Sequence, residues 1–153
     1  MKLDIGAGPA LEPGWESWDI KDGRDARRIS LPDESVDEIR AVHVLEHLGV
    51  ADSLPTLKEW ARVLKPGGRL YVAVPDFTRI AQAHLNGFPD RHLELYVVGG
   101  QIDADDFHHS IWWEGKLEAA LAICGFERFA LARPEGKNTS THWISLNAEA
   151  YKA

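Results

Sequence analysis

The sequence predicts an α/β fold whose sheet is mostly parallel and ends in a C-terminal antiparallel hairpin. Strand-like and helix-like segments alternate along the chain, which is typical of parallel sheets. Residues 69–75, RLYVAVP, form the nearly continuous apolar run of a strand buried on both faces. Two extended segments, 126–132 and 141–151, flank the polar stretch RPEGKNTS and predict the hairpin. With 153 residues, we expect one domain over 1–153.

The individual elements follow from local patterns. Strands are predicted at Leu3–Ile5, Trp15–Ile20 and Val36–Val42. In Ser53–Leu64, apolar residues recur at helical spacing, Pro55 suits the first turn and the sequence KPGG ends the helix. Further helices are predicted at residues 77–85, 91–98 and 114–124, the last with an apolar stripe before Gly125.

The N-terminal connections are too short for full helices. Six residues separate Gly8 from Trp15 and four separate Ile20 from Asp25, whereas a helical crossover needs about a dozen residues. We therefore expect the N-terminal helices to be shortened or missing. Parallel strands need cover on both faces. Four of the six tryptophans are expected to supply this cover or to form a homodimer interface: Trp15, Trp18, Trp112 and Trp113.

Composition excludes several classes of function. The formal net charge is -7 and the basic residues are scattered, so no nucleic-acid partner is expected. No apolar run approaches the roughly 18 residues of a membrane span, so no membrane association is expected. A single cysteine and a strand-like N-terminus predict a cytoplasmic location.

The N-terminal stretch LDIGAGPALEPGWESWDI raises the question of what binds at its glycine turn. It fails the dinucleotide pattern G-x-G-x-x-G because Leu11 takes the place of the third glycine. No P-loop pattern is present, and Asp4 before the turn would repel phosphate. The residues favour a phosphate-free ligand with an adenosine and an ammonium group, whose hydroxyl and cationic groups suit nearby carboxylates.

Four segments in order give the chain a family resemblance. They are LDIGAGPALEPGWESWDI, DARRISLPDESVDEIRAVHVLEHL, ARVLKPGGRLYVAVPDF and HHSIWWEGKLEAALAICGFERF. Over nearly its whole length the chain resembles the class I S-adenosylmethionine-dependent methyltransferases, in particular the small type 11-like group. The resemblance implies a Rossmann-like methyltransferase sheet, S-adenosylmethionine as cofactor and S-adenosylhomocysteine as product.

The resemblance also implies which residues bind the cofactor. Gly6, Ala7 and Gly8 would pass the methionine portion, with Asp4 near its ammonium group. Asp19, with Ile20 beside it, would accept both ribose hydroxyls, since an ionised carboxylate accepts two donors well. The remaining implied residues are Asp25 and Ala26 at the adenine and His43 at the methionine chain.

Methyl transfer from a sulfonium group is an in-line displacement, so positioning of the acceptor is the first requirement. We expect a small-molecule or saccharide acceptor, because enzymes of the group often serve sugar or cell-surface polysaccharide biosynthesis. A hydroxyl acceptor benefits from a general base. His108 and His109 are the first candidates for that base, and His47 and His142 are lesser ones.

Two other functions stay open. Residues His43 to His47 spell H-x-x-E-H, the inverted zinc-protease signature, although His43 ends a predicted strand where a zinc site needs both histidines on one helix. We therefore predict no metal site. The second alternative is a non-catalytic subunit that binds the cofactor or stabilises another methyltransferase, because fold alone does not guarantee activity.

Overall fold

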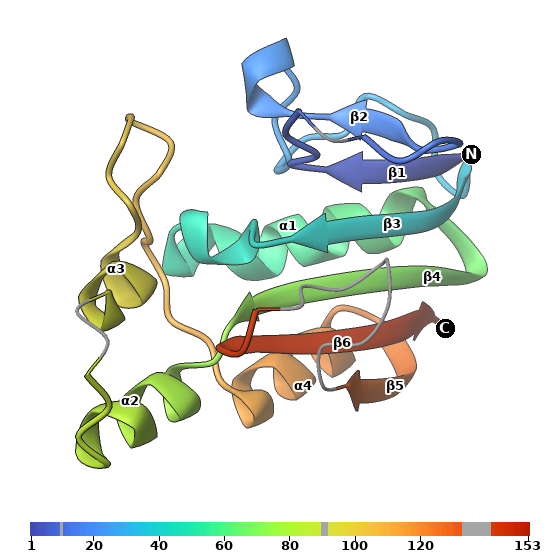
Figure 1. The fold of residues 1–153 in the computed structure, drawn as a ribbon. Helices are drawn as coiled ribbons and strands as arrows, with labels where there is room; N and C mark the ends of the chain where they lie inside the picture. Colours follow the sequence, from blue (N-terminus) through green and yellow to red (C-terminus); the bar gives the residue numbers. More distant parts are fainter. Residues whose placement is uncertain (10, 90–91, 133–141) are drawn as a thin grey trace.

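A six-stranded sheet in the order β2-β1-β3-β4-β6-β5 forms the centre of the computed structural model, which describes residues 1–9, 11–89, 92–132 and 142–153 (Figure 1). Strands β2, β1, β3 and β4 run parallel, and β6 lies antiparallel between β4 and β5. This arrangement confirms the predicted sheet and its antiparallel edge. The strands are β1 (Lys2–Ile5), β2 (Glu16–Trp18), β3 (Val36–Val42), β4 (Leu64–Pro75), β5 (Phe126–Ala132) and β6 (Ser145–Lys152).

The helices and turns agree with the sequence pattern except at their ends. The helices are α1 (Val50–Val63), α2 (Phe77–Leu85), α3 (Leu93–Val98) and α4 (Glu114–Ile123), and the two 3-10 turns are η1 (Ile20–Asp22) and η2 (Leu45–His47). Helix α1 begins three residues before the predicted start, which places Pro55 inside it. The sequence KPGG belongs to β4, because the strand begins directly at the end of α1 with a register shift opposite β3. The predicted hairpin loop lies outside the described residues.

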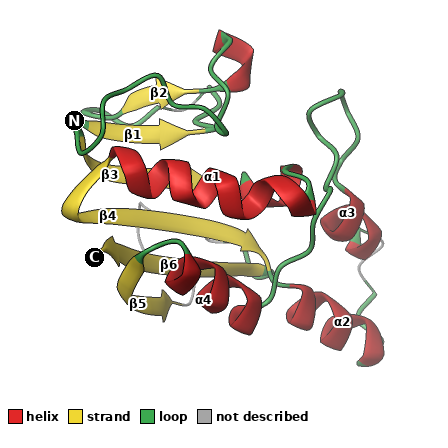
Figure 2. Cartoon of the chain, turned by 180° about the vertical axis from the view of Figure 1, so that it is seen from behind, coloured by secondary structure: helices red, strands yellow, loops and turns green. Residues whose placement is uncertain are grey.

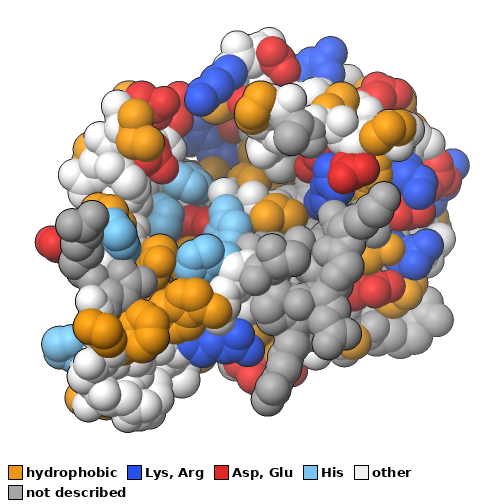
Figure 3. All heavy atoms as spheres, in the orientation of Figure 1, with side chains coloured by type: hydrophobic (Ala, Val, Ile, Leu, Met, Phe, Trp, Pro, Cys, Tyr) orange, Lys and Arg blue, Asp and Glu red, His pale blue; other side chains and the backbone are white. Residues whose placement is uncertain are grey.

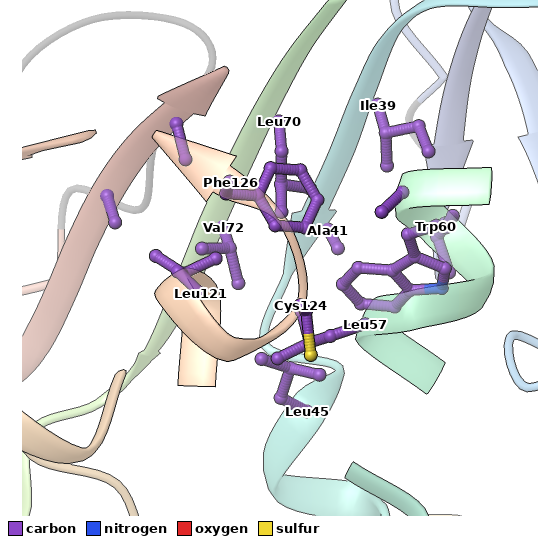
Figure 4. Packing of buried hydrophobic residues seen from close by; sticks show 14 of the residues in the cluster. Ile39, Ala41, Leu45, Leu57, Trp60, Leu70, Val72, Leu121, Cys124 and Phe126 are labelled. Carbon is purple, nitrogen blue, oxygen red and sulfur yellow. The ribbon is translucent and has the colours of Figure 1, made fainter. Parts of the chain in front are cut away.

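Helices α1 and α4 cover the same face of the sheet and enclose the core (Figure 2). Leu57 and Trp60 of α1 and Leu121 of α4 are fully buried against the strands (Figure 4). The apolar residues that face them from the strands include Ile39, Ala41, Leu70 and Val72. Replacing a core tryptophan such as Trp60 by alanine costs about 3–5 kcal/mol, so this layer carries much of the stability.

The opposite face carries charged side chains where a doubly covered sheet would have helices. No helix among the described residues packs there (Figures 1 and 2), and the connections from β1 to β3 contain only η1. Charges of opposite sign lie directly opposite in register: Lys2 faces Glu38 with an N–O distance of 3.0 Å, and Asp4 faces Arg40 in an ion pair. Such cross-strand pairs stabilise the pairing of neighbouring strands. The prediction of missing N-terminal helices is confirmed.

The four tryptophans divide into separate roles. The Arg40 guanidinium stacks on Trp15, with its central carbon 4.8 Å from the centre of the Trp15 ring. Trp15 therefore covers part of the charged face. Trp18 and Trp112 are buried in the core, whereas Trp113 is 42% exposed. The expected cover is therefore found at Trp15, and the homodimer stays a prediction. None of the described helices has the length and apolar character needed to cross a bilayer.

Candidate functional site

The carboxyl ends of β1, β2 and β3 meet at one edge of the sheet. Because β1 pairs with both β2 and β3, the chain moves outward from β1 to β2 and then crosses back to β3. Open α/β sheets bind ligands at such a reversal of strand order. A cavity of about 800 Å³ opens here, and its wall combines residues from all three strand ends: Ile5, Gly6, Gly8, Trp18, Asp19, Ile20, Asp25, Ala26, His43, Val44 and His47.

The glycine turn after β1 requires glycine at Gly6 for a steric reason. Gly6 has φ +67°, and a Cβ atom there would lie 2.8 Å from Cγ2 of Val44. Its amide donates a hydrogen bond of 3.0 Å to the Trp18 carbonyl, which ties the turn to β2. Gly8 has φ +59° but open space at the Cβ position, so its backbone faces the cavity unobstructed. Ala7 does not line the cavity.

Asp19 is fixed at the end of β2 by two backbone donors. Its Oδ1 accepts from the Lys21 amide at 2.9 Å, which caps η1, and its Oδ2 accepts from the Gly8 amide at 3.1 Å. A carboxylate has about four acceptor positions, so two remain for a ligand. Ile20 also lines the cavity and is 48% exposed.

Two core tryptophans hold the segment with Asp25 and Ala26 in place through hydrogen bonds. The Nε1 group of Trp18 donates to the Asp25 carbonyl and that of Trp60 to the Ala26 carbonyl, both at 2.9 Å. The Asp25 carboxylate accepts from Arg27 at 2.8 Å and 3.0 Å, and this hydrogen-bonded guanidinium lowers the pKa of Asp25 below its ordinary value. Asp25 therefore stays ionised at neutral pH. Nothing in the local sequence signals these tryptophan contacts.

Asp4 does not line the cavity. Its side chain is buried on the charged face of β1 and pairs with Arg40. The structure thus places it on the sheet and not at the expected position near the cofactor's ammonium group.

His43 directly follows β3 and has a left-handed conformation, with φ +56°. Its Nδ1 lies 2.8 Å from Oε1 of Glu46, and its Nε2 lies 3.0 Å from Oγ of Ser145. The H-x-x-E-H motif therefore has no continuous helix, because only Leu45–His47 form a 3-10 turn. Since His43 and His47 do not lie on one helical face, the geometry of the inverted zinc-protease signature is absent.

His108 and His109 lie on the loop of residues 99–109, which stands beside the carboxyl ends of the strands (Figure 1). His109 lines the large cavity, and its amide donates to the Glu46 carbonyl at 2.8 Å. His108 is half-buried on the other side of the loop and bonds the Tyr96 carbonyl through Nδ1. Burial lowers the pKa of His108 below its ordinary value.

Of the two lesser candidates for the general base, only one lines the cavity. His47 lines the cavity, whereas His142 lies in an aromatic group, 5.2 Å from the Tyr96 ring centre. Figure 3 shows histidine side chains gathered around a hollow in this face.

Several cavity residues were not found by sequence reasoning. Lys21 and Asp103 come within 3.9 Å of each other from η1 and from the 99–109 loop. The loop brings four acidic or small residues to the wall, Asp103, Ala104, Asp105 and Asp106. No local pattern marks these residues, because only the tertiary fold brings the loop to the strand ends.

Residues 21–72 match a family model described as "Methyltransferase domain". An uncharacterized 37.1 kDa protein in a transposon of Streptomyces fradiae is 33% identical over 87 residues, which are 51% of this chain. The chain spans about a quarter of the length of that relative, 25%.

Solved structures match the chain over almost its full length. A methyltransferase dependent on S-adenosylmethionine from Archaeoglobus fulgidus has a TM-score of 0.64 at 20% identity, covering 99% of this chain and 85% of its own. Human N-acetylserotonin methyltransferase in complex with S-adenosylmethionine gives 0.59 at 17%, covering 98% and 39%. A complex of the Haloferax volcanii Trm112 methyltransferase activator with a candidate methyltransferase gives 0.62 at 16%, covering 98% and 81%.

The chain therefore has the class I methyltransferase fold that the sequence resemblance predicted. The match of residues 21–72 to a methyltransferase domain agrees with this fold.

Proposed function

We propose that the cavity at the ends of β1, β2 and β3 binds S-adenosylmethionine and that the chain transfers its methyl group to a hydroxyl of a small-molecule or saccharide acceptor. One observation carries the proposal. The Asp19 carboxylate is held at the cavity wall by the Gly8 amide, so the glycine turn and the acidic strand end act as one unit.

The cavity residues suit the parts of this cofactor. The free acceptor positions of Asp19 match the two ribose hydroxyls, since hydrogen bonds to a charged acceptor are the stronger kind. The exposed backbone of Gly8 gives the methionine portion a close approach. Asp25 and Ala26, anchored by Trp18 and Trp60, offer a carboxylate and a backbone amide to adenine.

Transfer requires one bond to form as another breaks. The acceptor oxygen attacks the methyl carbon in line with the sulfonium sulfur, the carbon–sulfur bond breaks, and S-adenosylhomocysteine leaves. The hydroxyl proton passes to a base. His109 is our candidate, because it faces the cavity and no described residue hydrogen-bonds its ring.

Calorimetric titration with S-adenosylhomocysteine tests the binding half of the proposal. We expect a dissociation constant in the micromolar range, about -8 kcal/mol. Mass detection of methylated products from a panel of hydroxylated small molecules and sugars then tests transfer. Absence of binding at millimolar ligand would contradict the proposal.

A second candidate function is a subunit that stabilises another methyltransferase. The observation that favours it is the charged sheet face, on which no helix packs in the described part of the chain. Binding of S-adenosylhomocysteine without any methylated product would favour this alternative. Sedimentation at high concentration tests the expected homodimer, and a monomer there would exclude it.

A further inference from the structure

Three side chains beside the cofactor cavity bring potential metal-binding atoms together. Glu46 and His47 lie on η2, and His108 lies on the 99–109 loop. One carboxylate oxygen and one nitrogen from each ring lie within 4.8 Å of one another. The two rings meet edge to face, with centres 4.8 Å apart.

The hydrogen bonds of the two histidines leave the same nitrogen free in both. Nδ1 of His47 lies 3.1 Å from the Phe107 carbonyl, and Nδ1 of His108 lies 3.1 Å from the Tyr96 carbonyl. A carbonyl only accepts, so each Nδ1 carries the proton and each Nε2 keeps its lone pair. Metal-binding histidines are oriented in this way by donation from the other ring nitrogen.

Glu46 supplies a second and independent observation. Its side chain is 1% exposed. Oε1 accepts from His43 at 2.8 Å, whereas Oε2 is buried and has no hydrogen-bond partner among the described residues. A buried carboxylate oxygen is costly unless a donor or a cation satisfies it.

We propose that Glu46, His47 and His108 form a binding site for a divalent transition metal ion. Two imidazoles and one carboxylate suit Zn²⁺, Co²⁺ or Fe²⁺ more than Mg²⁺ or Ca²⁺, which prefer oxygen ligands alone. Tetrahedral ligand atoms around zinc lie about 3.3 Å apart, so the ligand atoms, now within 4.8 Å of one another, move closer by up to about 1.5 Å on binding. Three protein ligands leave a fourth position for water or substrate.

The ion would join two segments that the cavity depends on. It would link η2 to the 99–109 loop, where the His109 amide already bonds the Glu46 carbonyl. His43, which hydrogen-bonds Oε1 of Glu46, would not bind the ion itself but would orient the Glu46 carboxylate toward it. The proposal does not depend on the cofactor, because none of its three ligands is among the residues assigned to S-adenosylmethionine.

Titration of chelator-treated protein with Co²⁺, followed by visible absorption, tests the site. We expect one ion per chain and, with Zn²⁺ at a hundredfold excess over its dissociation constant, a rise of about 5–10 °C in the melting temperature. Glu46→Gln, His47→Ala and His108→Ala should each weaken binding by more than about 100-fold. The control variant His84→Ala alters an exposed histidine on α2 and should bind as the wild type does.

Circular dichroism shows whether each variant folds. If a histidine variant does not fold, Glu46→Gln, which keeps the side-chain shape, still tests the metal site. Wild-type protein that binds no Co²⁺ at 1:1 stoichiometry, or folded variants that bind it as tightly as wild type, would overturn the proposal. Calorimetry with S-adenosylhomocysteine on the same metal-free protein tests the proposed function separately.

Discussion

The Gly8 amide donates a hydrogen bond of 3.1 Å to Oδ2 of Asp19. This bond joins the turn after β1 to the end of β2 and orients the carboxylate toward the cavity. Asp19→Ala should therefore weaken S-adenosylhomocysteine binding by about 10- to 100-fold, since hydrogen bonds to charged groups contribute about 1.5–3 kcal/mol. Calorimetry measures this change. The control Asp22→Ala removes an acid of the same turn that does not line the cavity, and an equal loss there would contradict the assignment.

The two glycines of the turn should respond differently to alanine. Gly6→Ala adds a Cβ that meets Val44 at 2.8 Å in a strained conformation, so we expect a loss of about 2–4 kcal/mol in the free energy of unfolding. Gly8→Ala has open space and should lose only about 1–2 kcal/mol to strain. In the folded Gly8→Ala protein, cofactor affinity should fall by about tenfold or more. Urea titration and calorimetry separate the two effects, and equal destabilisation would count against this account.

Asp4 should matter for stability and not for cofactor contact. Asp4→Asn removes one charge of a buried ion pair, which costs about 3–5 kcal/mol. The double variant Asp4→Leu, Arg40→Met removes both charges and should recover most of that loss. Urea titration follows stability in both variants. A Asp4→Asn protein that is as stable as wild type but binds S-adenosylhomocysteine poorly would restore Asp4 to the cofactor site.

His109→Ala should lower turnover by about 10²- to 10⁴-fold, the usual contribution of a general base. Affinity for S-adenosylhomocysteine should stay within about twofold of wild type, because the residues assigned to the cofactor lie on the strand ends. The assay needs an acceptor found by the product screen, and His84→Ala serves as the control. Unchanged turnover in His109→Ala would remove this residue as the base.

Cys124 should report on unfolding. Burial raises the pKa of its thiol, so the native protein at pH 8 holds little thiolate, the reactive form. We expect slow labelling by a disulfide reagent in buffer and fast labelling in urea. Because the folded pKa is the higher one, the stability from this group is complete below the unfolded value of about 8.5 and is lost as pH rises through the folded value. Rapid labelling of native protein at pH 8 would contradict the burial.

The sequence was sufficient to predict the sheet, and it marked residues that the fold brings to the cavity. Local patterns marked β4 as a doubly buried strand, and the short connections before Asp25 revealed the missing helices. The ordered motifs placed Gly6, Gly8, Asp19, Asp25, Ala26 and His43, all of which line the cavity.

Sequence reasoning was insufficient where contacts between distant segments decide where a side chain lies. Asp4 follows the motif pattern, but its side chain points to the sheet face, where Arg40 of β3 pairs with it. Neighbouring His108 and His109 could not be told apart in sequence, yet the loop turns only His109 toward the large cavity. The unsatisfied oxygen of Glu46 is likewise visible only once His108 stands beside it.

A crystal structure of the protein soaked with S-adenosylmethionine tests the central claim most directly. The account predicts both ribose hydroxyls within hydrogen-bonding distance of the Asp19 carboxylate and the methionine portion along Gly6 and Gly8. A cofactor whose ribose lies away from Asp19 would contradict it.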